Sequence, residues 1–342
     1  MGIQTLIGRT GLAAAAFLGA TLALAPAHAQ QAIKFSLDFK FEGPSAPFLV
    51  AIDKGYFKAE GLDVTIDSAA GSLEPINRVA SGTYDMGFGD INSLIKFRDA
   101  NPSTPIKAVF MVYNKPAFSI VGRKSRGVTK PKDLEGKKLG APAPDGAYAQ
   151  WKIFVQANGI DVSKVTIENV GFPVREPMLA KGEVNAITGF SFSSYFNMLQ
   201  NGAAPADVKV MLMSDYGLIL YGNAIMVNKD YAKANPKVIA GFVKATIKGR
   251  QETYKDPASA VKSVMKRNET ADEKIELDRL KMAIKDNIAT KYVMENGFGG
   301  VEAGRLSKSL DQIGLTYDFT KKPTPAQMFD SSYLPPAAER KL

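Results

Sequence analysis

The sequence predicts an α/β protein built of two lobes. Short apolar strands alternate with loops rich in Gly and Pro and with amphipathic helices along most of the 342 residues. The composition is that of an ordinary globular protein, with 45% hydrophobic and 23% charged residues. Because the length exceeds what one compact core usually holds, we expect the strands to be divided between two lobes.

The first unit, residues 33–64, sets the pattern for the others. Apolar residues at 33–39 predict a strand, and apolar residues at helical spacing in 48–52 predict a helix. The loop between them carries Glu, Gly and Pro. A loop at the carboxyl end of a buried strand that feeds a helix N-terminus is where α/β proteins hold ligands. An ordinary turn of a first βα unit is an equally good interpretation of this stretch alone.

The same strand, loop and helix unit recurs downstream. Glycine and proline mark the loops, and apolar residues at helical spacing follow them. Further strands are expected at 62–66, 86–89, 106–113, 118–123, within 133–141, and at 165–170, 185–188 and 218–227. The pattern is helical from about 236 to 310. The chain therefore leaves one lobe near residue 120 and returns to it near residue 226.

Residues 1–29 have the pattern of a secretory signal peptide. An apolar segment at 12–25 follows a single charged residue, Arg9, and the small-x-small triplet at 27–29 predicts cleavage before Gln30. The apolar segment is shorter than the roughly 20 residues that span a bilayer, and no later segment is long enough. No cysteine follows the triplet to accept a lipid. We therefore expect a protein free in the periplasm.

Cleavage removes the only histidine, His28, and the chain has no cysteine. A mature chain without these residues has no thiolate nucleophile, no Ser-His-Asp triad, no zinc site built on imidazole or thiolate, and no disulfide. Chemistry based on carboxylates or lysine remains open, as does binding of hard cations by oxygen ligands. We expect no catalytic residues, no metal and no cofactor.

The formal net charge of +9 favours anionic partners, although many exported proteins are simply basic. The densest basic segment, 124–138, is broken by Gly and Pro and lacks interleaved aromatic residues. It is better explained as a solvated connector than as a nucleic-acid groove.

Several segments in a fixed order resemble a known family. They are Gly55 to Val64 (GYFKAEGLDV), Ala80 to Gly87 (ASGTYDMG), Leu134 to Lys137 (LEGK) and Lys181 to Ala186 (KGEVNA). Together they resemble the periplasmic solute-binding proteins of ABC importers for nitrate, sulfonates, taurine and thiamin-pyrimidine precursors. The first segment is the specific one. The last is weak, and Asn185 stands where an acid is common.

This resemblance implies a type II periplasmic binding protein fold, with two α/β lobes, two crossovers and a ligand cleft between the lobes. It places residues 30–119 and 227–342 in lobe 1 and residues 120–226 in lobe 2. The implied partners are a small-molecule ligand and an ABC permease with its ATPase. The binder is expected to be a monomer, and the permease recognises its closed form.

Candidate ligand contacts in lobe 1 lie where predicted strands meet loops and helices. Phe39 and Phe41 offer aromatic faces, although alternation along a strand usually leaves one such residue in the core. Asp38 and Asp90 offer acceptors for N–H or ammonium groups, although an Asp there often only caps the next helix. The other lobe 1 candidates are Ser72, Asn92 and Tyr113. Which of the residues between 38 and 42, Glu42 included, faces the cleft stays open.

Candidates in lobe 2 come from three loops that precede helices. Arg175 offers a fork for a carboxylate or sulfonate, with an interlobe or surface ion pair as the alternative. Tyr148 and Trp151 share a helix face, so one is expected to line the cleft while the other packs. Phe190 and Ser191 lie in the third loop and offer a ring and a hydroxyl group.

Several aromatic residues, two acids and one arginine suit a planar or zwitterionic organic molecule better than nitrate, which an acid would repel. We expect a heteroaromatic or amine-bearing solute, such as a thiamin-pyrimidine precursor, with alkyl or aryl sulfonates or taurine as the alternative.

Other classes of function also remain. Thiamin-pyrimidine synthases resemble these binders but use an active-site histidine and a lysine-held pyridoxal phosphate. The absence of histidine after position 29 argues against that chemistry. A permease-independent sensor or scavenger and a carboxylate hydrolase are the remaining alternatives.

Overall fold

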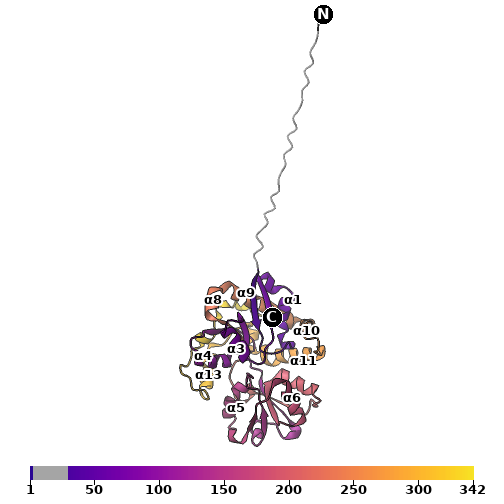
Figure 1. Ribbon diagram of the computed structural model, residues 1–342, viewed down its shortest axis with the longest axis vertical. Coiled ribbons are helices and arrows are strands. Elements are labelled where there is room, and N and C mark those ends of the chain that lie inside the picture. The colour runs from indigo at the N-terminus through magenta and orange to yellow at the C-terminus, as the bar shows by residue number, and fades with distance from the viewer. Residues whose placement is uncertain (3–29) are drawn as a thin grey trace.

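The computed structural model describes residues 1–2 and 30–342 (Figure 1). The predicted signal peptide, including His28, lies outside the described residues except for its first two positions. Within the described part, no helix combines the length and the apolar character needed to cross a membrane.

Two mixed β-sheets organise the described residues, which confirms the predicted two-lobed α/β fold. Each sheet has five strands, and each lies in its own lobe, with α5 and α6 on the lower lobe in Figure 1. In the first sheet the order is β2-β1-β3-β10-β4, and in the second it is β7-β6-β8-β5-β9. The strands are β1 (Gln31–Ser36), β2 (Leu62–Asp67), β3 (Met86–Asp90), β4 (Ile106–Met111), β5 (Phe118–Arg123), β6 (Lys138–Gly140), β7 (Thr166–Glu168), β8 (Ala186–Phe190), β9 (Val208–Leu212) and β10 (Asn223–Asn228).

Each sheet contains one strand that runs against its neighbours. Strand β10 pairs antiparallel with β3 and β4, while β1 pairs parallel with β2 and β3. Strand β5 likewise pairs antiparallel with β8 and β9 in the second sheet. The chain thus passes between lobes from β4 to β5 and again from β9 to β10. Since β10 begins at Asn223, the return strand starts ahead of the lobe boundary expected after residue 226, and the exact boundaries stay a prediction.

Helices cover both faces of each sheet. They are α1 (Ala46–Asp53), α2 (Tyr56–Ala59), α3 (Leu73–Ala80), α4 (Ile91–Ala100), α5 (Trp151–Ala157), α6 (Phe172–Lys181), α7 (Ser191–Gln200), α8 (Lys229–Ala234), α9 (Pro236–Lys255), α10 (Pro257–Met265), α11 (Glu273–Ala283), α12 (Lys291–Asn296), α13 (Ala303–Gly314) and α14 (Pro325–Met328). Helix α11 belongs to lobe 1 but packs against α7 of lobe 2.

Aromatic side chains fill the core of lobe 1 beneath the first loop. The ring of Phe35 in β1 lies 5.1 Å from that of Phe48 in α1 and 5.0 Å from that of Phe242 in α9. Phe48 also packs against Phe88 in β3 at 5.5 Å. These contacts bury four aromatic rings together, so they fix the end of β1, where the candidate site begins.

The two crossovers touch at Gly222. Its backbone N–H donates to the carbonyl of Tyr113 at 3.0 Å, and its own carbonyl accepts from Ile91 at 3.3 Å. A Cβ at this position would lie 2.8 Å from Tyr113 Cβ, closer than real Cβ atoms approach, and 3.1 Å from Pro116 Cα, a tight contact. Glycine at position 222 therefore allows the connections between the lobes to lie against each other.

Candidate ligand-binding site

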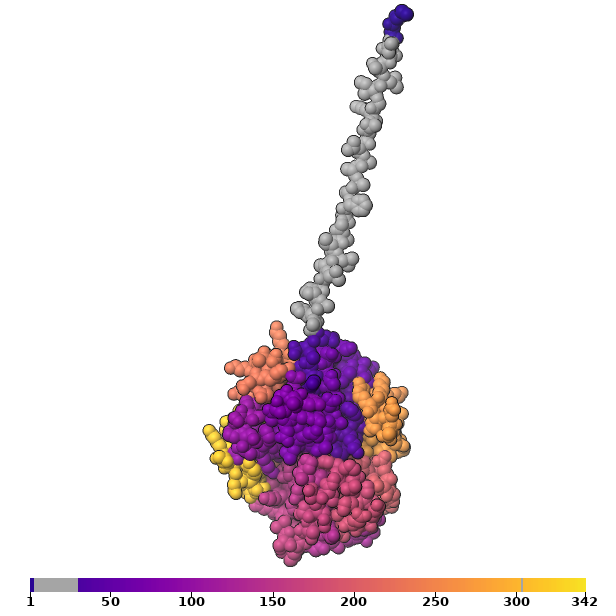
Figure 2. Space-filling view, in the orientation of Figure 1, coloured from indigo at the N-terminus to yellow at the C-terminus, as the bar shows by residue number. Residues whose placement is uncertain are grey.

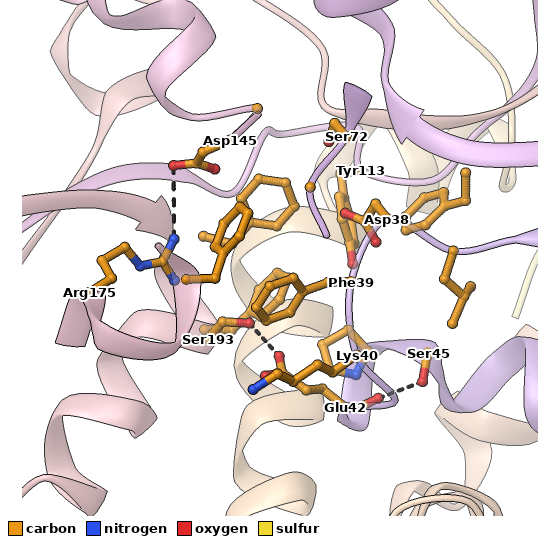
Figure 3. A pocket seen from close by; sticks show the side chains of 18 residues that line it. Asp38, Phe39, Lys40, Glu42, Ser45, Ser72, Tyr113, Asp145, Arg175 and Ser193 are labelled. Atoms are coloured by element: carbon orange, nitrogen blue, oxygen red, sulfur yellow. Dashed lines mark hydrogen bonds and ion pairs between the residues drawn. The ribbon is translucent and has the colours of Figure 1, made fainter. Parts of the chain in front are cut away.

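A cavity lies between the lobes, where the carboxyl ends of strands from both sheets meet (Figure 3). The space-filling view in Figure 2 shows that the two lobes are in contact with each other. The lining residues from lobe 1 are Leu37, Asp38, Phe39, Lys40, Glu42, Pro44, Ser45, Gly71, Ser72, Phe88 and Tyr113, and those from lobe 2 are Asp145, Gly146, Phe172, Arg175, Phe190, Phe192 and Ser193. The cleft expected from the resemblance is thus a site to which both lobes contribute.

Aromatic rings form much of the wall and contact one another across the lobes. Phe39 of lobe 1 meets Phe172, the first residue of α6, edge to face at 5.2 Å. Tyr113, just beyond β4, packs against Phe190 at 6.3 Å and Phe192 at 5.7 Å. Rings in such edge-to-face contacts leave flat faces for a planar ligand.

Asp38 follows the end of β1 and lines the cavity from lobe 1. Its Oδ2 accepts a hydrogen bond from Asn223 Nδ2 at 2.6 Å. Burial raises the pKa of Asp38 to about 7, the Asn223 bond opposes this rise, and the negative charges of Glu42 and Asp145 add to it. The carboxyl group is therefore poised to change charge near neutral pH.

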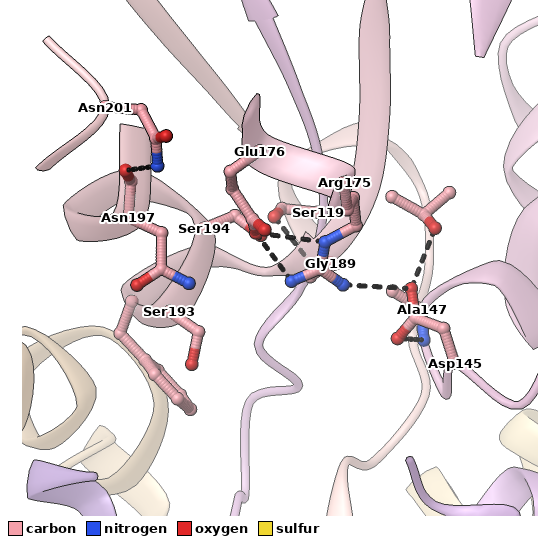
Figure 4. Close-up of polar contacts among 12 residues, drawn as sticks. Ser119, Asp145, Ala147, Arg175, Glu176, Gly189, Ser193, Ser194, Asn197 and Asn201 are labelled. Carbon is pink, nitrogen blue, oxygen red and sulfur yellow. Dashed lines mark hydrogen bonds and ion pairs between the residues drawn. The ribbon is translucent and has the colours of Figure 1, made fainter. Parts of the chain in front are cut away.

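Arg175 projects from α6 into the lobe 2 side of the cavity. Its Nε and Nη2 donate to Glu176 Oε1 at 2.9 and 2.6 Å, and Ser194 Oγ donates to the same oxygen at 2.8 Å (Figure 4). A Cβ at Gly189 would lie 2.2 Å from Ser194 Oγ, so the glycine makes room for this group. Burial disfavours the Arg175 charge, but Glu176 and Asp145 outweigh that effect and raise its pKa.

Asp145 lies in the loop after β6 and faces Arg175 from the other side. Its Oδ2 accepts from Thr188 Oγ1 at 2.7 Å and lies 3.9 Å from Arg175 Nη1. The backbone N–H of Ala147 donates to Oδ1 at 3.1 Å. Burial raises the pKa of Asp145, and Arg175 with these hydrogen bonds partly counters the rise.

Glu42 connects the lobes at another edge of the cavity. Ser193 Oγ of lobe 2 donates to Glu42 Oε2, and Arg279 Nη1 in α11 lies 3.5 Å from the same oxygen. Arg279 Nε also donates to Glu276 Oε2 at 3.1 Å, and that oxygen accepts from the backbone of Gly43 at 2.6 Å. Burial raises the pKa of Glu276, while Arg279 lowers it. A buried network of charges thus fixes the loop that carries Glu42.

Six of the twelve residues proposed from the sequence line this cavity, namely Asp38, Phe39, Ser72, Tyr113, Arg175 and Phe190. Ser72 immediately precedes α3 and is 1% exposed. Its hydroxyl has no hydrogen-bond partner among the described residues. Their role as ligand contacts stays a prediction, but the structure brings all six together.

The other six do not line it, for reasons of helix capping and packing. Asp90 caps α4: its Oδ1 accepts from the backbone of Asn92 at 2.9 Å and its Oδ2 from that of Ser93 at 2.8 Å. Asn92 Nδ2 donates to Asp90 and, at 2.7 Å, to the carbonyl of Tyr221. Asp90 also accepts from Gln150 Nε2 of lobe 2 at 2.8 Å. It therefore joins the lobes beside the cavity rather than within its wall.

The remaining four lie in or against the core. Phe41 packs against two core clusters of lobe 1. Trp151 is 4% exposed and stacks on Phe154 at 6.1 Å, and Tyr148 packs against the same core. Ser191 is fully buried at the start of α7. Neither member of the Tyr148 and Trp151 pair faces the cavity.

Sequence reasoning did not select several lining residues within loops that it had identified. Asp145 lies in the Pro142–Ala147 loop, Phe172 in the Gly171–Pro177 loop, and Ser193 at the end of the Gly189–Ser193 loop. Asp145 follows the end of β6 by five residues, and its place in a loop with Pro and Gly before a helix was the available signal. Within the described residues, no group of three or more acidic side chains is arranged to hold a metal ion.

Comparisons with known proteins agree with this architecture. The family model described as NMT1/THI5-like matches residues 43–260. The chain is 24% identical over 305 residues to a formylaminopyrimidine-binding protein of Halalkalibacterium halodurans, covering 87% of this chain and 89% of that protein. It is 25% identical over 240 residues to a 4-amino-5-hydroxymethyl-2-methylpyrimidine phosphate synthase of Saccharomyces cerevisiae, covering 67% and 69%.

A solved structure extends the likeness to the fold. The alkanesulfonate-binding protein of Xanthomonas axonopodis pv. citri, bound to MOPS, superimposes with a TM-score of 0.69 at 14% identity, covering 89% of this chain and 99% of that one. Since the family model spans more than half of the sequence, the chain belongs to the NMT1/THI5-like family and has the fold of periplasmic substrate-binding proteins.

Proposed function

We propose that this protein is the solute-binding component of an ABC importer, which captures a small organic ligand between its lobes and presents the closed form to a permease. The observation that carries the proposal is the aromatic cavity whose walls come from both lobes. A ligand there touches both lobes only when they are closed, so binding favours closure. The relative that binds formylaminopyrimidine aligns over most of both chains, which supports this function.

We propose a heteroaromatic or amine-bearing ligand rather than a sulfonate. Phe39 and Phe172 offer ring faces, and Asp38 accepts hydrogen bonds. Arg175, the residue best suited to a sulfonate, already donates from two nitrogens to Glu176. A sulfonate would therefore have to compete with a buried carboxylate for the guanidinium group.

We propose a binding role rather than catalysis. The similarity to yeast synthases raises the enzymatic alternative. The resemblance implies a histidine and a lysine-held pyridoxal phosphate for those enzymes, whereas no histidine occurs after position 29. Lys40 is the one lysine among the lining residues in the described part of the chain, and it is exposed.

The proposed location is the periplasm, reached through the signal peptide predicted for residues 1–29. The proposed partners are an inner-membrane permease and its ATPase, with the binder acting as a monomer. Co-purification of the protein with these components from detergent-solubilised membranes, and its solution mass, test this part of the proposal.

Ligand binding is tested on protein that begins at Gln30. Native mass spectrometry identifies any solute retained from expression. Thermal shift then compares 4-aminopyrimidines with taurine, alkanesulfonates and nitrate, because a ligand that binds only the folded state raises the melting temperature. We expect stabilisation by the heterocycles. If no compound of any class shifts the melting temperature and no solute is retained, the proposal is wrong.

A matched pair of variants connects the response to the cavity. Phe39→Ala removes a lining ring, whereas Phe319→Ala removes a similarly half-buried ring that packs on Tyr317 outside the lining. We expect the first to abolish or weaken the thermal shift and the second to leave it unchanged. Equal responses of the two variants would place the binding elsewhere.

A further inference from the structure

A buried arginine on the lobe 2 side of the cavity lies between two carboxylates. Arg175 and Glu176 have exposed fractions of only 2% and 3%. Glu176 Oε1 accepts hydrogen bonds from Arg175 Nη2 at 2.6 Å and Nε at 2.9 Å. Asp145 Oδ2 lies 3.9 Å from Arg175 Nη1, and Asp145 lines the cavity. This group of three side chains carries a net charge of −1 when all are ionised.

A second buried arginine repeats the arrangement where α11 meets the cavity. Arg279 is 2% exposed and donates to Glu276 at 3.1 Å. Glu42 lies 3.5 Å from the guanidinium group and lines the cavity. In both groups a glutamate from the arginine's own helix holds it most closely, and the second acid is left less fully compensated.

Asp38 adds a third acid between these groups. It accepts from Asn223 and forms no ion pair within 4.0 Å among the described residues. Lys40 is exposed, and its Nζ lies 5.8 Å from the ring centroid of Phe39. When all groups are ionised, the lining residues and the residues paired with them contribute five acids (Asp38, Glu42, Asp145, Glu176, Glu276) and three bases (Lys40, Arg175, Arg279). This local excess of negative charge is opposite in sign to the +9 of the whole chain.

The aromatic rings of the cavity wall act in the same direction as this negative charge. The faces of aromatic rings are electron-rich and attract cations, most strongly where water is excluded. Phe39, Phe172 and Tyr113 present such rings to the cavity. The unpartnered hydroxyl of Ser72, 1% exposed, adds a polar group that a ligand can satisfy.

We propose that the cavity selects ligands that carry a positive charge, an ammonium or amidinium group on a small planar body, with Asp38, Asp145 and Glu42 as its counter-charges. This inference rests on the proposed binding function and adds the sign of the ligand's charge. An anion would face three carboxylates and two arginines that are already paired with glutamates on their own helices. A cation gains charge-assisted hydrogen bonds from acids whose present hydrogen bonds come from neutral groups.

Isothermal titration with matched probes tests the charge preference. Benzamidine is cationic at neutral pH, benzamide is its neutral isostere, and benzoate and benzenesulfonate are anions on the same ring. We expect benzamidine to bind at least about tenfold more tightly than benzamide, as a charge-assisted hydrogen bond predicts. We expect no binding of the two anions.

Variants place the effect at the named acids. Asp38→Asn and Asp145→Asn are each expected to reduce the benzamidine preference by about tenfold while leaving benzamide binding within about threefold. Asp63→Asn, at an exposed position of β2, serves as the control and should change neither. Thermal melting of each variant verifies that it is folded, and the comparison of probes on the unmodified chain needs no variant.

Each outcome is decisive. Tighter binding of benzamide or an anion than of benzamidine overturns the charge preference but leaves the binding function intact. If no probe binds, the charge of the solute retained in native mass spectrometry decides, and an anionic or neutral solute overturns the inference. If there is also no retained solute, the charge of any compound that raises the melting temperature decides in the same way. Absence of probe binding, of retained solute and of any thermal shift removes the proposed function itself, and this inference with it.

Discussion

Arg279 donates a hydrogen bond from Nη1 to the backbone carbonyl of Ser193 at 3.0 Å, and so joins α11 of lobe 1 to the first turn of α7 in lobe 2. The same nitrogen donates to the carbonyl of Phe192 at 3.2 Å, and Nη2 donates to Asn197 Oδ1 at 3.2 Å. Elsewhere between the lobes, Lys96 Nζ in α4 donates to the carbonyl of Ala149 at 2.8 Å. The lobes are thus joined by polar contacts at more than one place.

Replacing Arg279 by Met should destabilise the protein and weaken the contact between α11 of lobe 1 and α7 of lobe 2. The variant leaves the carboxylates of Glu276 and Glu42 without their shared cation, and breaking a buried pair costs about 3–5 kcal/mol. We expect lower stability in chemical denaturation and a larger radius of gyration of the ligand-free protein by small-angle scattering. Lys274→Met breaks an exposed pair with Asp278 on the same helix and should cost about 0–1 kcal/mol. Indistinguishable results for the two variants would contradict the assigned role.

Replacing Glu176 by Gln should alter ligand preference. Glu176 accepts from two nitrogens of Arg175 and from Ser194, and Gln retains an acceptor while removing the charge. The guanidinium charge then becomes available to an anion, so we expect benzenesulfonate binding, absent in the unmodified chain, to become measurable by titration calorimetry. Glu183→Gln, at an exposed position just after α6, is the control. Unchanged anion affinity would mean that Glu176 does not limit the use of Arg175.

Asp38 should make stability depend on pH. Its pKa in the folded protein is about 7, against an ordinary value of 3.8, so the folded state holds a proton that the unfolded state has already released. The free energy of unfolding of the ligand-free protein should therefore fall as pH rises between these two values. The charged or titratable groups that act on Asp38 are Glu42, Asp145 and Tyr113. Denaturant titrations at several pH values, compared with Asp38→Asn, isolate its contribution.

The same titration should affect binding in the opposite direction. A cation prefers the ionised carboxyl group, so benzamidine affinity should rise with pH across the neutral range and flatten above it. Asp38→Asn should remove this rise. In the denaturant titrations, a difference in unfolding free energy between wild type and Asp38→Asn that does not change with pH would refute the raised pKa of Asp38.

Asp90 should matter for stability and not for ligand charge. Asp90→Ala removes the N-cap of α4, worth about 0.5–2 kcal/mol, and also the hydrogen bond from Gln150 of lobe 2. We expect a lower melting temperature with the ratio of benzamidine to benzamide affinity unchanged. Asp272→Ala removes an exposed N-cap of α11 and should cost less. A changed affinity ratio in Asp90→Ala would return this residue to the list of ligand contacts.

The repeated strand and loop units predicted the alternating α/β elements, because hydrophobic periodicity and glycine or proline punctuation are local properties of the chain. The division into two lobes was predicted from the chain length and from the family resemblance. The repeated units also identified the loops around the cavity. They did not distinguish Phe39 from Phe41, since the backbone after β1 is irregular and strict alternation no longer applies. Phe39 reaches Phe172, whereas Phe41 packs on the core.

An aspartate at the junction of a strand and a helix has two uses, and local sequence does not choose between them. Asp90 is followed directly by α4 and caps it, whereas Asp38 precedes a loop and turns to Asn223. The role of Glu42 depends on Arg279, which is far away in the sequence. Nothing in the helical pattern of α11 separates Arg279 from a solvent-exposed arginine, so the second charge group emerged only from the three-dimensional structure.

The contact of the crossovers at Gly222 has a mechanical consequence. The two lobes extend in opposite directions from this contact, so a small change in the spacing of the connections is amplified with distance, as along a lever arm. A methyl group at position 222 would push against Tyr113 and Pro116 and shift this pivot. Because Tyr113 also lines the cavity, the strain would reach the ligand through a wall residue as well as through the angle between the lobes. The absence of a side chain at position 222 therefore affects both the spacing of the connections and the wall of the cavity.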